Sequence, residues 1–413
     1  MKRKKSKYID IWLLLVLGGF SLAQPAPGQS PYTLGQLIAL ANTNNLLIKI
    51  ADIDKEIAAA EYRNLRALPN PGFEYARGKG EIPGEPAKPS LWELGLNWSI
   101  PNPLYRHFLL RSRKTGITEA EIQAEMSKRE IIKDLKTHFY RLQFFSKIKT
   151  FGEEKLQRLE EVNKITKAKV SIGEVKEIDY LRSSVEIQKS KTNLFRILKI
   201  IAYEKTKVNE FLNYQIPGEF TIEEDFAFTP LPGIETRVNQ FIEASPVIRL
   251  KFNRMKREKE NFKSAGFSII EEIQIFGSQE KELDGKKWTV GIGVSVPLFN
   301  WKSAQVEKAR LEKQKARLDY EHERKHFSSE VQRMIAEIRV LEKEIETFST
   351  ALLTEGKESM ALSETLYKEG EVPLVVYLDS QDSFYEIQER FYETITQWNI
   401  LKAELEALLG GEG

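Results

Sequence analysis

The sequence contains no cysteine and only four histidines among its 413 residues. The absence of cysteine excludes a disulfide framework, a cysteine-ligated zinc site, a thiol nucleophile and a lipid-modified N-terminal cysteine. Four histidines leave little room for a histidine-rich metal site. Lysine and arginine number 62 and aspartate and glutamate 60, so no basic excess indicates a nucleic-acid partner. Much of the chemistry that enzymes commonly use is therefore missing.

The first 23 residues have the pattern of a secretory signal peptide. Residues 2–7 are rich in lysine and arginine, residues 11–20 are apolar, and small residues stand at Ser21 and Ala23. The apolar stretch is too short for a membrane-spanning helix, which needs about 20 residues. We expect cleavage after Ala23 and an exported product.

Two motifs occur twice in the chain at nearly the same spacing. Six of the eleven positions in 173–183 are identical in 370–380, which lies 197 residues further on. Segment 94–101 likewise matches 290–297 at a spacing of 196. Two independent matches at nearly one offset predict an internal duplication. The predicted divisions are a signal peptide at 1–23, a first repeat at 24–215, a Pro- and Gly-rich linker at 216–233 and a second repeat at 234–413.

Each repeat contains one very long helical stretch. After Pro103 no strong helix breaker follows until Gly173, and after Pro297 none follows until Gly370 except Gly356. Each stretch predicts a helix of about 65 residues, which is roughly 100 Å long. Apolar residues recur at spacings of three and four, as in coiled-coil packing with a narrow seam.

Shorter helices are predicted on either side of each long one. In the first repeat, Thr33 and Gln36 form a capping-box pattern that starts a helix over 33–68, and a second helix follows over 174–213. Their lengths of roughly 54 and 60 Å add up to about one long helix when they are stacked end to end. Each repeat therefore predicts a rod two helices wide, with a β-hairpin at one end.

The hairpin strands are predicted near 73–78, 91–100, 267–276 and 288–296. In the second and fourth, apolar residues alternate with small or polar ones. The apolar positions are Trp92, Leu94, Leu96 and Trp98 in one strand and Trp288, Val290, Ile292 and Val294 in the other. Such alternation fits either a half-buried soluble sheet or a transmembrane barrel strand with its apolar face toward lipid.

Three features favour the membrane interpretation. The strands have about the 9–11 residues that a tilted strand needs to span a bilayer. Tryptophans stand near the strand ends, where membrane interfaces favour them. Small or polar residues fill the opposite face. Four strands cannot close a barrel, and open edges are not viable in lipid, so the chain must oligomerise. Three copies would give twelve strands and two copies eight.

Taken together, these features resemble the TolC-like outer-membrane efflux proteins, over nearly the whole mature chain. The resemblance implies a mainly α fold with transmembrane β structure, in which a homotrimer forms a 12-stranded barrel in outer-membrane lipid and an α-helical tunnel in the periplasm. It also implies a periplasmic adaptor and an inner-membrane pump of the RND or ABC type as partners. The run 67–71 is similar to the heavy-metal (CzcC-like) branch of the family.

In that family, acidic residues after the tip glycine line the closed periplasmic end. By this resemblance, Asp179 and Asp379 fall on aperture positions, whereas Val376 departs from the family pattern. Arg182 occupies the position equivalent to Asp379, and we expect both to help hold the aperture closed. The alternative is that these are ordinary solvated charges.

The tip residues also have a structural explanation. Gly173 and Gly370 permit tight reversals between antiparallel helices, and Pro373 suits the start of the helix that follows. The resemblance assigns adaptor docking to these same tips.

The segment His322-Glu-Arg-Lys-His326 spells the H-E-x-x-H signature of zinc proteases. It lies in a charged run on a rod-like helix, and no local argument supplies a third ligand or a substrate cleft. We therefore expect a protein that is not an enzyme and that has no metal site or cofactor.

Two alternatives to an efflux channel remain at this stage. One is the same channel serving type I protein secretion. The other is a secreted coiled-coil scaffold whose hairpins are soluble.

Overall fold

A computed structural model describes residues 31–409 except 85, 87 and 271, so the expected signal peptide lies outside the described residues. The helices are α1 (Leu34–Asn44), α2 (Leu46–Arg66), α3 (Pro103–Ser171), α4 (Glu177–Phe211), α5 (Val238–Ala244), α6 (Pro246–Phe267), α7 (Ser303–Thr347), α8 (Leu353–Glu369) and α9 (Leu374–Leu409), with a 3-10 turn η1 (Ile234–Arg237) and a π-helical turn η2 (Phe348–Leu352). The strands are β1 (Gly72–Lys79), β2 (Ser90–Pro101), β3 (Glu272–Lys281) and β4 (Lys286–Val294).

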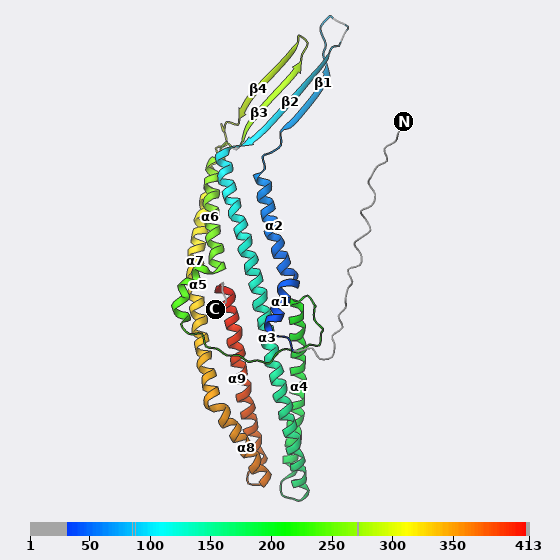
Figure 1. Cartoon of the computed structure of the whole chain (residues 1–413), viewed down its shortest axis with the longest axis vertical. Coiled ribbons are helices and arrows are strands. Elements are labelled where there is room, and N and C mark those ends of the chain that lie inside the picture. Colours follow the sequence, from blue (N-terminus) through cyan, green and yellow to red (C-terminus); the bar gives the residue numbers. More distant parts are fainter. Residues whose placement is uncertain (1–30, 85, 87, 271, 410–413) are drawn as a thin grey trace, which may run out of the picture.

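The long helices form an elongated wall with the sheet at one end (Figure 1). α3 packs against α2 in the half near the sheet and against α4 in the other half, so α2 and α4 are stacked along it. α6 and α9 are stacked in the same way beside the column formed by α7, η2 and α8. The predicted end-to-end stacking of shorter helices against long ones is confirmed. No helix of the described chain is both long and apolar enough to cross a membrane.

The two long helical stretches differ in continuity. α3 runs unbroken for 69 residues, with Pro103 in its first turn and the Asn102 side chain accepting a hydrogen bond from the Leu104 N–H at 3.0 Å. The matching stretch of the second repeat begins at Ser303 and is interrupted by η2. Its late start has a local cause. The Asn300 side chain accepts a hydrogen bond from the Lys302 N–H at 2.9 Å, and Lys302 has a φ of +51° before α7 begins.

The helix expected over 33–68 is in fact two helices. Its capping box at Thr33 and Gln36 is confirmed, but Asn45 has an extended backbone that separates α1 from α2. The Asn45 side-chain oxygen accepts hydrogen bonds from the N–H groups of Leu47 and Ile48, and its amide donates to the Phe211 carbonyl at 2.9 Å. One buried side chain thus caps α2 and also satisfies the last carbonyl of α4.

The four strands form one antiparallel sheet in the order β1-β2-β3-β4. The central pair, β2 and β3, joins the two repeats, because each repeat contributes one hairpin. The expectation of a strand at 267–276 was wrong: α6 continues to Phe267, and the strand begins at Glu272. The Ser268 N–H and hydroxyl both donate to the Ala265 carbonyl, which closes the helix and delays the strand. β4 ends at Val294, two residues earlier than expected.

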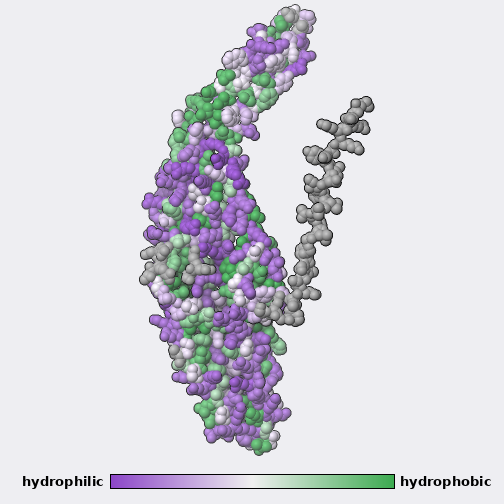
Figure 2. All heavy atoms as spheres, viewed as in Figure 1, coloured by the Kyte–Doolittle hydropathy of each residue, from purple (hydrophilic) through white to green (hydrophobic). Residues whose placement is uncertain are grey.

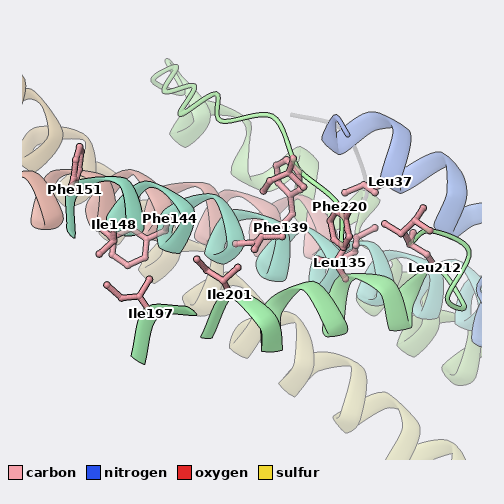
Figure 3. Packing of buried hydrophobic residues seen from close by; sticks show 14 of the residues in the cluster. Leu37, Leu135, Phe139, Phe144, Ile148, Phe151, Ile197, Ile201, Leu212 and Phe220 are labelled. Carbon is pink, nitrogen blue, oxygen red and sulfur yellow. The ribbon is translucent and has the colours of Figure 1, made fainter. Parts of the chain in front are cut away.

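The linker between the repeats packs onto the wall. Ile216, Phe220 and Ile222 belong to the same buried cluster as Leu135 and Leu212 (Figure 3). The Tyr32 N–H donates to the Thr221 carbonyl at 2.9 Å, and the Glu223 N–H donates to the Tyr32 carbonyl at 3.1 Å. The linker therefore holds the start of α1 against the middle of the wall.

Replacing Asn45 with alanine removes two capping bonds and leaves the buried Phe211 carbonyl without its donor. We expect Asn45→Ala to lower the free energy of unfolding by about 2 kcal/mol. Asn44→Ala is the matched control, because the Asn44 amide donates to the Leu40 carbonyl of its own helix. Guanidinium unfolding followed by circular dichroism measures both variants. Equal midpoints for the two would contradict the capping role of Asn45.

Candidate functional site: the sheet and the helical tips

The strand register places the expected apolar residues on one face of the sheet. Residues directly opposite each other in antiparallel strands point to the same face. Trp98 pairs with Ile275, which in turn pairs with Ile292, and Leu96 reaches Val290 in the same way through Gly277. All eight residues expected on this face therefore share it. They are Trp92, Leu94, Leu96, Trp98, Trp288, Val290, Ile292 and Val294.

This apolar face is largely uncovered within one chain. Trp288, Val290 and Ile292 are 77%, 70% and 75% exposed. The exposed apolar run continues beyond β4 through Val296 and Leu298 to Phe299, which is 97% exposed. Figure 2 shows hydrophobic residues gathered at the base of the sheet, where it joins the helices. A contiguous apolar surface of this kind marks contact with lipid or with another chain.

The opposite face carries small and polar residues. Across β1, β2, β3 and β4 it presents Glu74, Gly95, Ser278 and Thr289, which pair with one another in sequence across the sheet. Two large apolar residues also lie on this face: Leu91 near the loop end, and Phe276, whose ring lies so close to Gly291 that a Cβ atom at residue 291 would be 2.4 Å from it. Phe276 lies at the end of the expected strand 267–276, but the alternation there was too irregular to predict which face it occupies. The small and polar face of the sheet is therefore compatible with contact with water, and the Phe276 ring packs against the glycine opposite it.

Both tip glycines adopt the left-handed conformation that the turns require. Gly173 has a φ of +78° and Gly370 a φ of +84°. Pro373 immediately precedes α9, and its carbonyl accepts a hydrogen bond from the Val376 N–H at 3.0 Å. The two tips are not equivalent. A Cβ atom at Gly370 would lie 3.0 Å from the Glu174 carboxylate, whereas a Cβ at Gly173 would meet open space.

The three charged residues assigned to the aperture lie near the tips but make no ion pair among the described residues. Asp179 is half-buried in the first turn of α4, Arg182 is exposed one turn later, and Asp379 is exposed on α9. α3 contacts both α4 and α9 and so lies between them. The structure therefore does not bring Arg182 and Asp379 together within one chain.

The contacts that do join the two helical hairpins near the tips involve other residues. Lys155 on α3 pairs with Asp382 on α9 at 2.5 Å, and Arg158 on α3 pairs with Glu364 on α8 at 3.0 Å. Sequence reasoning missed these pairs because each joins residues more than 200 positions apart. The charges themselves were visible, but no sequence signal indicated which would meet.

A buried polar cluster lies closer to the tip. The hydroxyls of Thr166 and Tyr367 are 2.5 Å apart, and the Lys169 ammonium donates to the Glu174 carboxylate at 2.6 Å and to the Tyr367 carbonyl at 3.3 Å. Burial raises the pKa of Tyr367, so its hydroxyl keeps its proton at neutral pH. α3 of the first repeat is thus hydrogen-bonded to the end of α8 at Tyr367, in a place largely shielded from water.

The two histidines of the H-E-x-x-H segment lie side by side on α7, with ring centroids 6.2 Å apart. Glu323 points to a different partner, the Lys251 ammonium at 3.4 Å. Among residues 31–409, apart from the three masked positions, no group of three His, Cys, Asp or Glu side chains is placed to hold a metal ion. The geometry offers no zinc-protease centre at this segment.

Comparison with known proteins gives one family match, over the second repeat. The family model described as "Outer membrane efflux protein" matches residues 275–411. No curated protein matches the chain.

Solved structures share its fold. They include a membrane protein from Pseudomonas aeruginosa (18% identity, TM-score 0.80, covering 92% of this chain and 90% of that one) and the outer membrane protein VceC from Vibrio cholerae (14%, 0.78, 92% and 96%). Another is the open state of the Neisseria gonorrhoeae MtrE outer membrane channel (19%, 0.77, 92% and 89%). The chain is therefore similar to the outer membrane efflux family over residues 275–411 and shares the fold of these solved channels over nearly all of its described length.

Proposed function

We propose that three copies of this chain form a passive conduit from the periplasm to the exterior, as the outer-membrane component of a tripartite efflux system. Channels of this family lie in the outer membrane, extend into the periplasm, form trimers and work with adaptor and pump partners. The family is a transport conduit and not an enzyme. The similarity of residues 275–411 to this family favours a channel over a secreted coiled-coil scaffold with soluble hairpins.

The observation that carries this proposal is the two-sided sheet with open edges. β1 and β4 each have a neighbour on one side only, and one face of the sheet is apolar and exposed. In hydrocarbon an unpaired strand edge leaves backbone groups unsatisfied, at several kcal/mol each. Pairing of β4 with β1 of the next copy would satisfy both edges, and three copies would supply the twelve strands of a closed barrel.

The helical wall has matching unfinished edges. On one edge, α2 exposes Leu46, Ile50 and Ile53, and on the other edge α7 exposes Leu311 and Leu318. Nearer the tips the corresponding exposed residues are Leu181 and Val185 on α4 and Leu362 on α8. Burial of these stripes between neighbouring copies would complete the tunnel by the same rotation that closes the barrel.

We assign the aperture at the tips to two sets of residues. Within each chain, the Lys155 and Arg158 pairs would hold the α8–α9 hairpin against α3. Because α3 separates α4 from α9, an Arg182–Asp379 contact would form only between neighbouring copies. Asp179 would add to the negative potential of the bore. The turns at Gly173 and Gly370, with Pro373, would receive the helical hairpin of the adaptor.

The finer identity of the system is also a proposal. We also propose that the chain is divided into a signal peptide at 1–23, a first repeat at 24–215, a linker at 216–233 and a second repeat at 234–413. The pump would be of the RND or ABC type, and the similarity of 67–71 to the heavy-metal branch favours a metal-efflux system. Protein secretion through the same conduit is the second candidate. The apolar face of the sheet would contact outer-membrane lipid directly.

Purified protein added to a planar bilayer should produce stepwise ionic currents, because the sheets of three copies would close into one barrel around a water-filled pore. The same sample should migrate as a heat-modifiable oligomer on a gel. A polypeptide that stays monomeric and dissolved without detergent would contradict the proposal.

Removing the Lys155–Asp382 and Arg158–Glu364 ion pairs should increase the fraction of time that the channel is open. Each partly exposed ion pair contributes roughly 0.2–1 kcal/mol, so losing both pairs in Lys155→Gln with Arg158→Gln should raise the open fraction about twofold to thirtyfold. Lys149→Gln is the control, since Lys149 pairs with Glu153 inside α3 at 3.3 Å. Single-channel recording compares them. If the double variant and the control conduct alike, the two ion pairs do not restrain the hairpin.

The aperture charges should set ion preference. We expect Asp379→Asn to lower the preference for cations over anions and Arg182→Gln to raise conductance, because each removes a charge from a narrow bore. Val376→Asp supplies an acid where the family pattern expects one and should raise cation preference. Reversal potentials across a salt gradient measure all three. Unchanged conductance and selectivity in the Asp379 and Arg182 variants would assign these residues to solvated helix surfaces.

A further inference from the structure

The apolar face of the sheet ends in a row of cations. The register aligns Arg77 with Trp92, Trp92 with Lys281 and Lys281 with Lys286, so these four side chains form one cross-strand row on the same face. The row lies at the loop end of the sheet, away from the helices (Figure 1). It places three positive charges around one indole ring.

The rows below it change composition in a definite order. The next row toward the helices contains Tyr75, Leu94, Gln279 and Trp288, and the row after that contains Phe73, Leu96, Gly277 and Val290. Adjacent rows on one face are two residues apart, which is about 7 Å along the strands. The sequence from cations through amphipathic aromatics to apolar residues reproduces the order of headgroup, interface and hydrocarbon in a bilayer.

Acidic strand residues are confined to one face of the sheet. No strand position on the apolar face holds an acid, whereas Glu74, Glu93 and Glu280 all occupy the opposite face. Lys79 adds a fourth cation to the apolar face, one row further out. Among the described residues these cations have no carboxylate partner, and the Arg77 guanidinium donates only to the Ser90 hydroxyl at 3.4 Å. These cations of the apolar face are therefore not neutralised by a direct ion pair.

We propose that Arg77, Lys281 and Lys286 bind the phosphate groups of outer-leaflet lipids, with Trp92 seated at the lipid interface between them. The inference rests on the proposed function, because it requires the apolar face to contact lipid. At the loop end that face meets the outer leaflet, since the helices extend from its other end into the periplasm. Arginine supplies paired N–H donors to phosphate oxygens, and each lysine supplies a point charge.

The shape of the surface favours a lipid over a free anion. The row lies on an exposed face of a sheet and not in a cavity, so a free phosphate would remain largely hydrated there. A lipid gains apolar contact as well, because its acyl chains can lie along the rows of Leu94, Leu96 and Val290 below the cations. Each lysine or arginine near an anionic lipid surface adds a favourable increment, which salt weakens.

The test measures binding of bis-phosphorylated lipid A to the detergent-solubilised oligomer of the full chain, by microscale thermophoresis. The triple variant Arg77→Gln, Lys281→Gln and Lys286→Gln should bind at least about tenfold more weakly. Lys286→Gln alone should weaken binding about threefold, whereas Lys287→Gln, on the opposite face next to it, should not. Equal affinity of the wild type and the triple variant overturns the proposal, as does an equal effect of Lys286→Gln and Lys287→Gln.

Two further measurements separate the possible failures. Dephosphorylated lipid A should bind much more weakly, and excess inorganic phosphate should not displace the phosphorylated lipid; full displacement would assign the row to the free anion and overturn the lipid proposal. Because the chain has no cysteine, Val290→Cys can carry a single fluorophore. Its quenching by spin-labelled acyl chains in vesicles supports the membrane position of the sheet. Quenching at Val290 with unchanged lipid affinity in the triple variant rejects only the phosphate site, whereas no quenching rejects both proposals.

Discussion

The backbone hydrogen bonds of the sheet impose the constraint on which the rest of the molecule depends. β1 and β4 each present an unpaired edge beside a broad apolar face. Water can satisfy such edges, but hydrocarbon cannot, so the sheet is compatible with lipid only when other copies of the chain supply the missing neighbours. The exposed apolar stripes along α2 and α7 follow the same logic in water, since each is half of a contact that the single chain leaves open.

The duplication gives two repeats with similar elements and different mechanical properties. α3 is continuous, whereas its counterpart is divided by η2, and π-helical turns often occur at functional sites in helices. The tips differ too: Lys169 and Glu174 from the first repeat surround Gly370 of the second, while Gly173 faces open space. Polar contacts from the first repeat therefore surround the turn of the α8–α9 hairpin, whereas the turn at Gly173 has no such contacts among the described residues.

The sequence predicted those features that depend on local patterns. Alternation identified the apolar faces of β2 and β4, the lack of breakers predicted α3, and the repeated glycines located both tips. The errors arose where a single polar side chain decided the outcome: Asn45 divides one expected helix, and Ser268 closes α6 at the second residue of an expected strand. Periodicity is preserved through such positions, so it does not report them.

The tip contacts could not be predicted for a different reason. Lys155, Arg158, Asp382 and Glu364 lie in helices rich in both signs of charge, where many pairings are compatible with the sequence. Only the lateral order of the helices selects among them. The same order assigns any Arg182–Asp379 contact to the boundary between copies, since α3 lies between their helices.

The positions of the charged residues distinguish the two ends of the apolar face of the sheet, which hydrophobicity alone does not. Alternation separates an apolar face from a polar one, but it does not say which end of the apolar face meets a headgroup region. The register does, because it collects Arg77, Lys281 and Lys286 into one row and leaves the acids on the opposite face. A face that merely needed solubility at its end would gain equally from either sign of charge. The apolar face holds cations and no acid at its strand positions, whereas the opposite face holds the acids together with Lys287. Contact of the apolar face with anionic headgroups, as proposed, accounts for this asymmetry.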